Sequence, residues 1–229
     1  MDFPATFWHS NGHSMKSSEK HTHRIKHNTL KIRILPPPSG SISTAKPDLA
    51  ADGGVDVEIR IVDQSHEEQI IGLDKLVTPM IKSGMYHHSN LEVIGQCLSG
   101  GLSLGLFEAE TLVGYRLTFV PGLSDVNLGR YLDLTTEQLM QVAQLYGTLL
   151  SPNFRGQGVG ETLMNQSLRL IFDKGFRYAL VTVHPANKTS LAMCLRCGFD
   201  LVKEITFYGG LPRLLLRKMI TRTQLTTNL

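Results

Sequence analysis

Ser151-Pro-Asn-Phe-Arg-Gly-Gln-Gly-Val-Gly160 is the stretch of this sequence that decides the fold. Its glycines, Gly156, Gly158 and Gly160, let the backbone approach a ligand without obstruction by side chains. An apolar run over 145–150 precedes the stretch and an amphipathic pattern follows it, so the expected order is strand, glycine-rich turn and helix. Unpaired N–H groups in the first turn of a helix attract anions. The stretch therefore predicts a binding site for a phosphate or pyrophosphate.

Two common phosphate-binding motifs do not fit this turn. A P-loop requires Lys and then Ser or Thr after its last glycine, whereas Glu161 and Thr162 follow Gly160 here. A dinucleotide-binding fingerprint requires a third glycine at the position where this sequence has Leu163. The P-loop reading fails outright, and the dinucleotide reading fails less decisively.

A second pattern lies downstream. The apolar run 179–183 leads to His184-Pro-Ala-Asn187, and a short helical pattern then ends at Cys197-Gly198-Phe199. The sequence therefore predicts a second unit of strand and helix beside the first.

The two patterns together resemble one known family. Arg155-x-x-Gly158-x-Gly160 after an apolar strand resembles the acetyl-CoA loop of the GNAT superfamily of N-acetyltransferases. The downstream pattern resembles that superfamily's second signature, in which the Asn contacts the pantetheine arm of CoA and the Gly-Phe pair begins a strand. The resemblance covers residues 55–219 and is specific mainly over residues 145–199.

The resemblance implies an α/β (mixed α+β) fold, with a mostly antiparallel central sheet flanked by helices and a splayed strand pair at the CoA site. Local patterns agree with this order. Residues 55–61 alternate between apolar and polar side chains, which predicts the first strand. The other expected elements are a helical region over 66–95 kinked or split at Pro79, a hairpin of 102–107 and 112–120, a loop over 123–135, a helical turn over 136–141, a helix that buries Met164, Leu168, Ile171 and Phe172, and a closing hairpin of 201–208 and 213–219.

We expect three parts in the chain: a tail over 1–54, the GNAT-like domain over 55–219 and a C-terminal tail over 220–229. Residues 1–54 contain seven Lys or Arg against four Asp or Glu, five of the nine histidines and a run of three prolines. This composition is typical of a disordered, weakly basic extension. Its histidine spacing is too irregular to predict a metal site, its charge is too small to predict a nucleic-acid arm, and it fits an organelle transit peptide only approximately.

Composition limits the class of protein. With 229 residues and 41% apolar content the chain can bury a full core, and no apolar run approaches the roughly 18 residues of a membrane span. Three cysteines are too few for a disulfide framework, and we expect the Cys194-x-x-Cys197 pair to pack in the core and bind no metal. We therefore expect a soluble, cytoplasmic protein with no membrane or nucleic-acid partner.

The resemblance implies transfer of an acetyl group from acetyl-CoA to an amine. Free backbone groups of the strand before the turn would bind the pantetheine amides and the thioester oxygen, N–H groups of the turn would bind the pyrophosphate, and Arg155 would supply charge nearby. The implied cofactor-binding residues are Thr148, Leu149, Leu150, Arg155, Gly156, Gln157, Gly158, Val159, Gly160, Glu161 and Asn187.

The expected catalytic groups depart from the family. Many members carry a Tyr seven residues after the Asn, where it protonates the departing thiolate, but this chain has Cys194 there. The thiol could replace the Tyr as the acid, or it could be a small core residue. The position of the glutamate base in some members is Thr182, so the amine would lose its proton through water ordered by Tyr146, His184 or Tyr208.

The acceptor is predicted only as a primary amine of a small molecule, peptide or protein. Candidate pocket residues come from the 66–95 segment, the 121–135 loop and the last hairpin: Tyr86, His87, His88, Asp125, Asp133 and Tyr208. Because both family acid and base positions have changed, a non-catalytic acyl-CoA-binding or interaction module is the alternative function.

Overall fold

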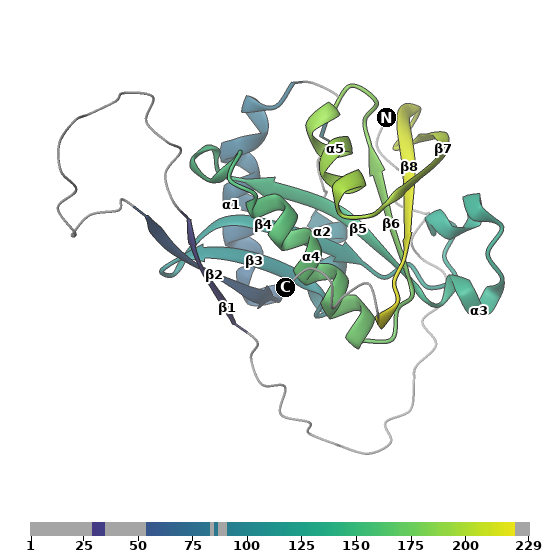
Figure 1. Cartoon of the computed structure of the whole chain (residues 1–229), viewed down its shortest axis with the longest axis horizontal. Helices are drawn as coiled ribbons and strands as arrows, with labels where there is room; N and C mark the ends of the chain where they lie inside the picture. The colour runs from purple at the N-terminus through teal and green to yellow at the C-terminus, as the bar shows by residue number, and fades with distance from the viewer. Residues whose placement is uncertain (1–28, 35–53, 83–84, 87–90, 223–229) are drawn as a thin grey trace, which may run out of the picture.

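The computed structural model describes residues 29–34, 54–82, 85–86 and 91–222. Eight strands in these ranges form one sheet in the order β1-β2-β3-β4-β5-β6-β8-β7 (Figure 1). Every neighbouring pair is antiparallel except β5 and β6. The strands are β1 (Leu30–Ile34), β2 (Val55–Val62), β3 (Ser103–Glu108), β4 (Thr111–Phe119), β5 (Val142–Leu150), β6 (Tyr178–Val183), β7 (Asp200–Phe207) and β8 (Leu211–Met219).

Helices cover both faces of the sheet. Figure 1 shows α4 and α5 in front of the sheet, with α1 and α2 behind it. Each face has its own core cluster, with Leu168 of α4 in one and Ile70 of α1 in the other. The helices are α1 (Glu67–Val77), α2 (Leu91–Ser99), α3 (Thr136–Leu139), α4 (Val159–Asp173) and α5 (Lys188–Arg196), with short 3-10 turns at η2 (Gln64–His66), η3 (Thr78–Met80), η4 (Leu128–Leu132) and η5 (Pro152–Phe154). This mixed, mostly antiparallel architecture is the expected one.

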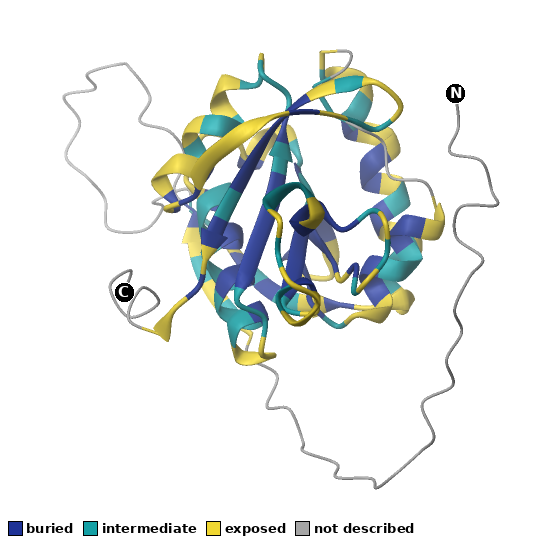
Figure 2. Ribbon diagram, turned by 90° about the vertical axis from the view of Figure 1, so that its right-hand side faces the viewer, coloured by how far each residue is buried: buried dark blue, intermediate teal, exposed yellow. Residues whose placement is uncertain are grey.

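Most predicted elements are present, with shifted ends. The helical region after β2 is split as expected, because Pro79 lies in η3 and α1 ends at Val77. The expected loop contains η4, whose N-cap Asn127 accepts a hydrogen bond from the N–H of Gly129 at 2.8 Å. Figure 2 shows that the middle of the sheet is buried, while exposed residues gather on outer helix faces and at the sheet edge.

One strand lies where only tail was expected. Residues 30–34 pair antiparallel with β2 as β1, so the prediction of a disordered tail is wrong for them. Their sequence alternates Leu, Lys, Ile, Arg and Ile, which is a strand pattern. Lys31 lies 3.2 Å from Glu58 and Arg33 lies 3.3 Å from Asp56, which adds cross-strand ion pairs. Residues 1–28 and 35–53 lie outside the described ranges, so the rest of the tail stays a prediction.

The separation of β5 from β6 creates the site. These parallel strands pair only at Val142–Tyr178, Ala143–Ala179 and Gln144–Leu180, although both continue beyond that point. On its other side β5 remains paired with β4 as far as Leu150, with a bulge near Tyr146. The sheet is therefore continuous on one side of β5 and open on the other, as expected for a splayed pair.

Within the described ranges, no helix is both long and apolar enough to cross a membrane. The same residues contain no group of histidine, cysteine and acidic side chains that could hold a metal ion. Cys97, Cys194 and Cys197 are all unpaired and buried. Cys194 and Cys197 both belong to the core cluster between α4, α5 and β8, which agrees with packing of the pair in the core.

Candidate active site

The glycine-rich turn connects the end of β5 to the start of α4. Gly156 and Gly158 have φ angles of 75° and 76°, which glycine adopts without the steric cost that other residues bear. Gly158 is also the N-cap of α4, and no side chain caps this helix end. The N–H groups of Val159 and Gly160 therefore begin α4 without intrahelical acceptors. This geometry matches the anion site expected from the sequence.

Gly160 has a packing role in addition to the one expected. It lies inside the first turn of α4 and its φ is not positive. A Cβ atom at Gly160 would lie 3.1 Å from Sδ of Met193 in α5. The missing side chain thus lets α4 and α5 pack closely, and the backbone N–H of Gly160 still lies in the first turn of α4.

Polar and charged side chains around the turn bind other groups of the protein itself. Arg155 Nε donates to the carbonyl of Leu150 at 3.0 Å, which ties the turn to the end of β5. Gln157 Nε2 donates to the carbonyl of Asn153 at 2.7 Å. Glu161 forms a 3.0 Å ion pair with Arg196 of α5, so its negative charge has a partner beside the helix N-terminus.

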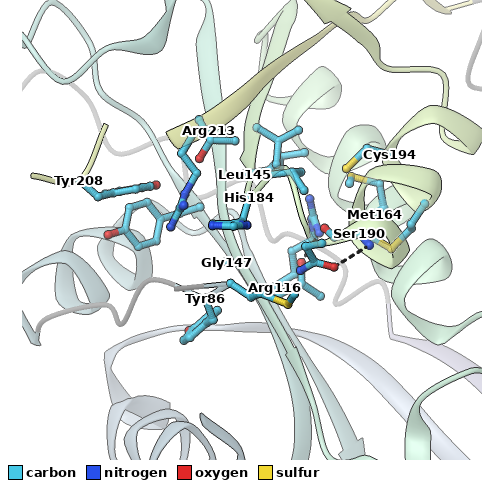
Figure 3. Close-up of a pocket in the computed structure, with 18 residues that line it drawn as sticks. Tyr86, Arg116, Leu145, Gly147, Met164, His184, Ser190, Cys194, Tyr208 and Arg213 are labelled. Atoms are coloured by element: carbon cyan, nitrogen blue, oxygen red, sulfur yellow. Dashed lines mark hydrogen bonds between the residues drawn. The ribbon is translucent and has the colours of Figure 1, made fainter. Parts of the chain in front are cut away.

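A cavity of about 100 Å³ lies where β5 and β6 separate. It is lined from β4, β5, β6, β8, α4, α5, the turn between β7 and β8 and the residues after α1 (Figure 3). The sequence-predicted residues that line it are Tyr86, Tyr146, Thr148, His184, Asn187, Cys194 and Tyr208. Leu149 is instead buried in the core cluster on the α1 and α2 face, so only its backbone can serve a ligand.

Asn187 caps α5 and also faces the cavity. Its side-chain oxygen accepts the N–H of Ser190 at 3.1 Å, which is typical N-cap geometry. Because that bond uses only the oxygen, the Nδ2 amide remains a donor for a ligand. A helix cap and a ligand contact can thus come from one side chain.

Cys194 lies on α5 in the wall of the cavity and is fully buried. Burial raises the pKa of its thiol, while nearby Arg116 and a hydrogen bond with Ser190 oppose that rise. The thiol therefore remains protonated at neutral pH. A protonated thiol facing the cavity has the form that a proton donor needs.

Arg116 of β4 was not expected in the site. It is 1% exposed and lines the cavity, and its Nη1 donates to Thr148 Oγ1 on the neighbouring strand. Burial lowers the pKa of its guanidinium to about 10, so the group stays charged. The available sequence signal was a lone arginine in the apolar run 112–120.

A buried carboxylate lies behind the cavity. Asp74 of α1 accepts hydrogen bonds from the hydroxyls of Tyr86 at 2.9 Å and Tyr115 at 2.8 Å. The two hydroxyl oxygens lie 2.9 Å apart. Tyr86 lines the cavity, and its hydroxyl would lie 3.8 Å from a Cβ at Gly147. Sequence reasoning identified Tyr86 but missed Asp74, whose helical position gave no sign of its partner.

The opposite end of the cavity is aromatic and cationic. Tyr208 lies 6.1 Å from Tyr146 in an edge-on ring contact, and the guanidinium of Arg213 lies 5.4 Å from the Tyr208 ring. Burial raises the pKa of Tyr208, which keeps its phenol protonated. His184 Nδ1 accepts the N–H of Ala186 at 3.1 Å, so the neutral ring carries its proton on Nε2 and acts as a donor. This tautomer does not favour His184 as a base.

Two expected acceptor residues lie elsewhere. Asp125 lies 3.7 Å from Arg130 within its own loop, with 80% of its side chain exposed. Asp133 follows η4 in a left-handed conformation, with φ of 52°. Neither is among the residues that line the cavity. His87 and His88 lie outside the described residues.

Comparisons with known proteins support the fold and match part of the chain to one family model. Residues 97–199 match the model described as the acetyltransferase (GNAT) family. The chain is similar to the Salmonella typhimurium yncA structure, a putative acetyltransferase with acetyl-CoA, at 12% identity and a TM-score of 0.53, covering 72% of this chain and 95% of that one.

Two plant structures give a similar result. The Arabidopsis thaliana NAA60 complex with acetyl-CoA has 16% identity to this chain and a TM-score of 0.56. Arabidopsis thaliana Naa50 with the bisubstrate analogue CoA-Ac-MVNAL has 14% identity and a TM-score of 0.55. Each alignment covers 72% of this chain and 99% of the other. A comparison with curated protein sequences found no match. Family model and fold agree: residues 97–199 of this chain match the model of the GNAT acetyltransferase family.

Proposed function

We propose that this protein transfers the acetyl group of acetyl-CoA to a primary amine. The observation that carries the proposal is the cavity at the separation of β5 and β6, next to the left-handed glycine turn at the start of α4. Structures of similar fold bind acetyl-CoA, including Salmonella yncA and Arabidopsis NAA60. The family match of residues 97–199 supports acyltransferase chemistry in the same region.

The turn and the strand end would hold acetyl-CoA in an extended form. N–H groups from Gly156 to Glu161 suit its pyrophosphate, because the helix start attracts negative charge. The β5 edge beyond Gln144 has no strand beside it, so its backbone groups suit the pantetheine amides. The amide nitrogen of Asn187 adds a donor at the same opening. Bound acetyl-CoA supplies the thioester that is cleaved.

The described residues offer a route for the proton of the attacking amine. Tyr86 can accept that proton at its hydroxyl while passing its own proton to Asp74, 2.9 Å away. Asp74 is buried and already accepts a second hydrogen bond, from Tyr115, which holds the carboxylate in place. Through this relay Asp74 takes the role that Thr182 cannot fill.

The leaving thiolate needs a proton in return. Cys194 Sγ carries one at neutral pH because burial raises its pKa, and it lines the same cavity. Tyr146 and Tyr208 add polar hydroxyls on the opposite wall. We assign proton donation to Cys194, and positioning of the acceptor to the two tyrosines.

A non-catalytic acyl-CoA-binding module is the second candidate. It is favoured by the full burial of Cys194 and by the absence of acidic side chains among the residues described as lining the cavity. Both functions require acetyl-CoA binding, and only the enzyme releases free CoA with an amine. Residence in the cytoplasm and the lack of a nucleic-acid partner remain predictions from the sequence.

Thermal unfolding with increasing acetyl-CoA tests the binding step. Acetyl-CoA at about a hundredfold above Kd should add about 2.7 kcal/mol of stability. Gly158→Glu should abolish this shift, because a carboxylate in the anion turn repels pyrophosphate. Lys174→Gln, which changes the net charge by the same amount at the far end of α4, is the control. Release of free CoA across an amine panel then separates the enzyme from the binding module, and no shift in the wild type contradicts both.

A further inference from the structure

A buried positive charge without an acidic partner lies in the cavity. Arg116 is 1% exposed, and its Nη1 donates a hydrogen bond to the uncharged hydroxyl of Thr148. Its Nε is buried with no hydrogen-bond partner in the described part of the chain. The titratable groups that act on its charge are the thiols of Cys194 and Cys197, and no carboxylate is among them.

The other polar groups of the cavity add donors. Arg213 is 2% exposed and lies at the opposite end, stacked on Tyr208 (Figure 3). His184 presents an Nε2 proton when neutral, because its Nδ1 is bonded to the backbone. Among the described lining residues there are two guanidinium groups and no carboxylate. Asp74 lies behind Tyr86 and outside the lining, and it is not among the groups that act on the charge of Arg116.

This arrangement is unfavourable for the protein alone. A buried charge is costly unless a group of opposite charge or several hydrogen bonds compensate it. A guanidinium presents its donors in a planar fork that fits the two oxygens of a carboxylate. The group that balances Arg116 therefore has to come with a ligand, and a carboxylate matches both its charge and its shape.

We propose that a substrate carboxylate binds in this cavity, with the guanidinium of Arg116 as its charge partner. The inference rests on the proposed function, in that the cavity is the site of acyl transfer. Two sources of the carboxylate fit the same chemistry. An amino acid or peptide acceptor carries one close to its amine, and a dicarboxylic acyl group carries one at the far end of the thioester.

Turnover separates the two sources. Free CoA release is measured with acetyl-CoA and matched acceptors, phenylalanine against phenethylamine and alanine against ethylamine. It is measured again with succinyl-CoA and malonyl-CoA against acetyl-CoA, using one acceptor. We expect about a 10- to 100-fold higher kcat/KM for the carboxylate-bearing member in one arm, which is the range for a hydrogen bond to a charged group.

Variants connect the preference to Arg116. Arg116→Met should remove the preference, while Arg116→Lys, which keeps the charge but not the fork, should keep part of it. Arg217→Met is the matched control, because Arg217 on β8 also has an unpartnered buried Nε but does not line the cavity. CoA-dependent stabilisation of each variant reports whether its fold and cofactor turn are intact. If Arg116→Met does not fold, Arg116→Lys decides: a reduced carboxylate preference supports the inference, and a preference equal to that of the wild type overturns it.

A binding readout keeps this inference separate from the proposed function. Thermal unfolding at constant ionic strength is compared with succinate and with neutral succinamide. Stabilisation by succinate that Arg116→Met loses supports the carboxylate site even if CoA neither binds nor turns over, an outcome that overturns only the proposed function. The inference is overturned if CoA binds while neither turnover nor stability distinguishes carboxylates from neutral analogues, or if any such difference survives in Arg116→Met.

Discussion

At the scale of single residues, the buried charge of Arg116 should lower the stability of the free protein. Because its buried charge has no acidic partner in the described structure, the folded protein should gain stability when that charge is removed. We expect Arg116→Met, without substrate, to raise the free energy of unfolding by about 1–3 kcal/mol. Urea denaturation at neutral pH measures the change.

The Arg116→Lys variant is the control for that gain. Its charge remains buried, so its stability should not exceed that of the wild type. A loss of stability in Arg116→Met would mean that the bond to Thr148 and the packing of the aliphatic stem outweigh the cost of the charge.

The proton relay gives a second prediction at this scale. Tyr86→Phe removes the hydroxyl between the cavity and Asp74 but keeps the ring. We expect kcat to fall about 10- to 100-fold, the contribution typical of general base catalysis, with little change in the affinity for acetyl-CoA. Steady-state kinetics and thermal shift with acetyl-CoA measure the two effects.

Tyr115→Phe provides a matched control. It also removes a hydroxyl bonded to Asp74, but Tyr115 is fully buried and does not line the cavity. Its kcat should fall much less than that of Tyr86→Phe. Equal losses in the two variants would indicate that both act only by holding Asp74, and would contradict the relay.

These residues also mark the limit of prediction from the sequence. The left-handed glycines and the Asn187 cap could be predicted because their roles depend on the local backbone. Arg116, Asp74 and Tyr86 come from β4, from α1 and from the segment after it, and only strand register and helix packing bring them to one opening. No local pattern contains that information.

At the scale of elements, α5 depends on an N-cap that also faces the ligand. Asn187→Asp keeps an oxygen for the N–H of Ser190 but removes the amide donor and adds negative charge. We expect the stability without ligand to stay within about 0.5 kcal/mol of the wild type. The affinity for CoA should fall about tenfold or more, for the loss of one hydrogen bond and the added repulsion. Urea denaturation and calorimetric titration with CoA measure these.

Asn187→Ala separates the two roles further. It removes the cap as well, so the free energy of unfolding should fall by about 1 kcal/mol while CoA affinity also falls. If Asn187→Asp binds CoA as well as the wild type does, the amide of Asn187 has no ligand and is only a helix cap.

Helices and strands with a strong hydrophobic periodicity have the places predicted from the sequence. Prediction is poorer where a tertiary contact determines the secondary structure. The amphipathic stripe of α4 and the hairpin of β3 and β4 have the expected places. β1 was assigned to the tail because it is five residues long and surrounded by polar, proline-rich sequence. Its pairing with β2 is a tertiary contact, which outweighed the composition of the segment.

At the scale of the whole molecule, three buried thiols divided between the two faces of the sheet make stability depend on alkaline pH. Burial raises the pKa of Cys97 to about 12 and that of Cys197 to about 11, and it raises the pKa of Cys194 as well. The folded state therefore keeps these protons above about pH 9, where unfolded thiols lose them. The stabilisation is complete below about pH 9 and is lost as the pH rises toward the folded values.

Cys97 gives the clearest test, because it is fully buried in the core between α2 and the sheet, away from the cavity. One such thiol lowers the free energy of unfolding by about 1.4 kcal/mol per pH unit above its unfolded pKa, or about 2 kcal/mol between pH 9 and 10.5. Urea denaturation of the wild type and of Cys97→Ala across this range should therefore give curves that converge by about that amount, since tyrosines titrate alike in both proteins. Cys97→Ala has a lower free energy of unfolding at every pH because the substitution leaves a cavity. The test is therefore the difference in pH dependence between the two proteins, and the constant difference in stability is not used. Parallel curves would mean that Cys97 ionises as easily in the folded protein as in the unfolded chain, and that the core on the α2 face admits water.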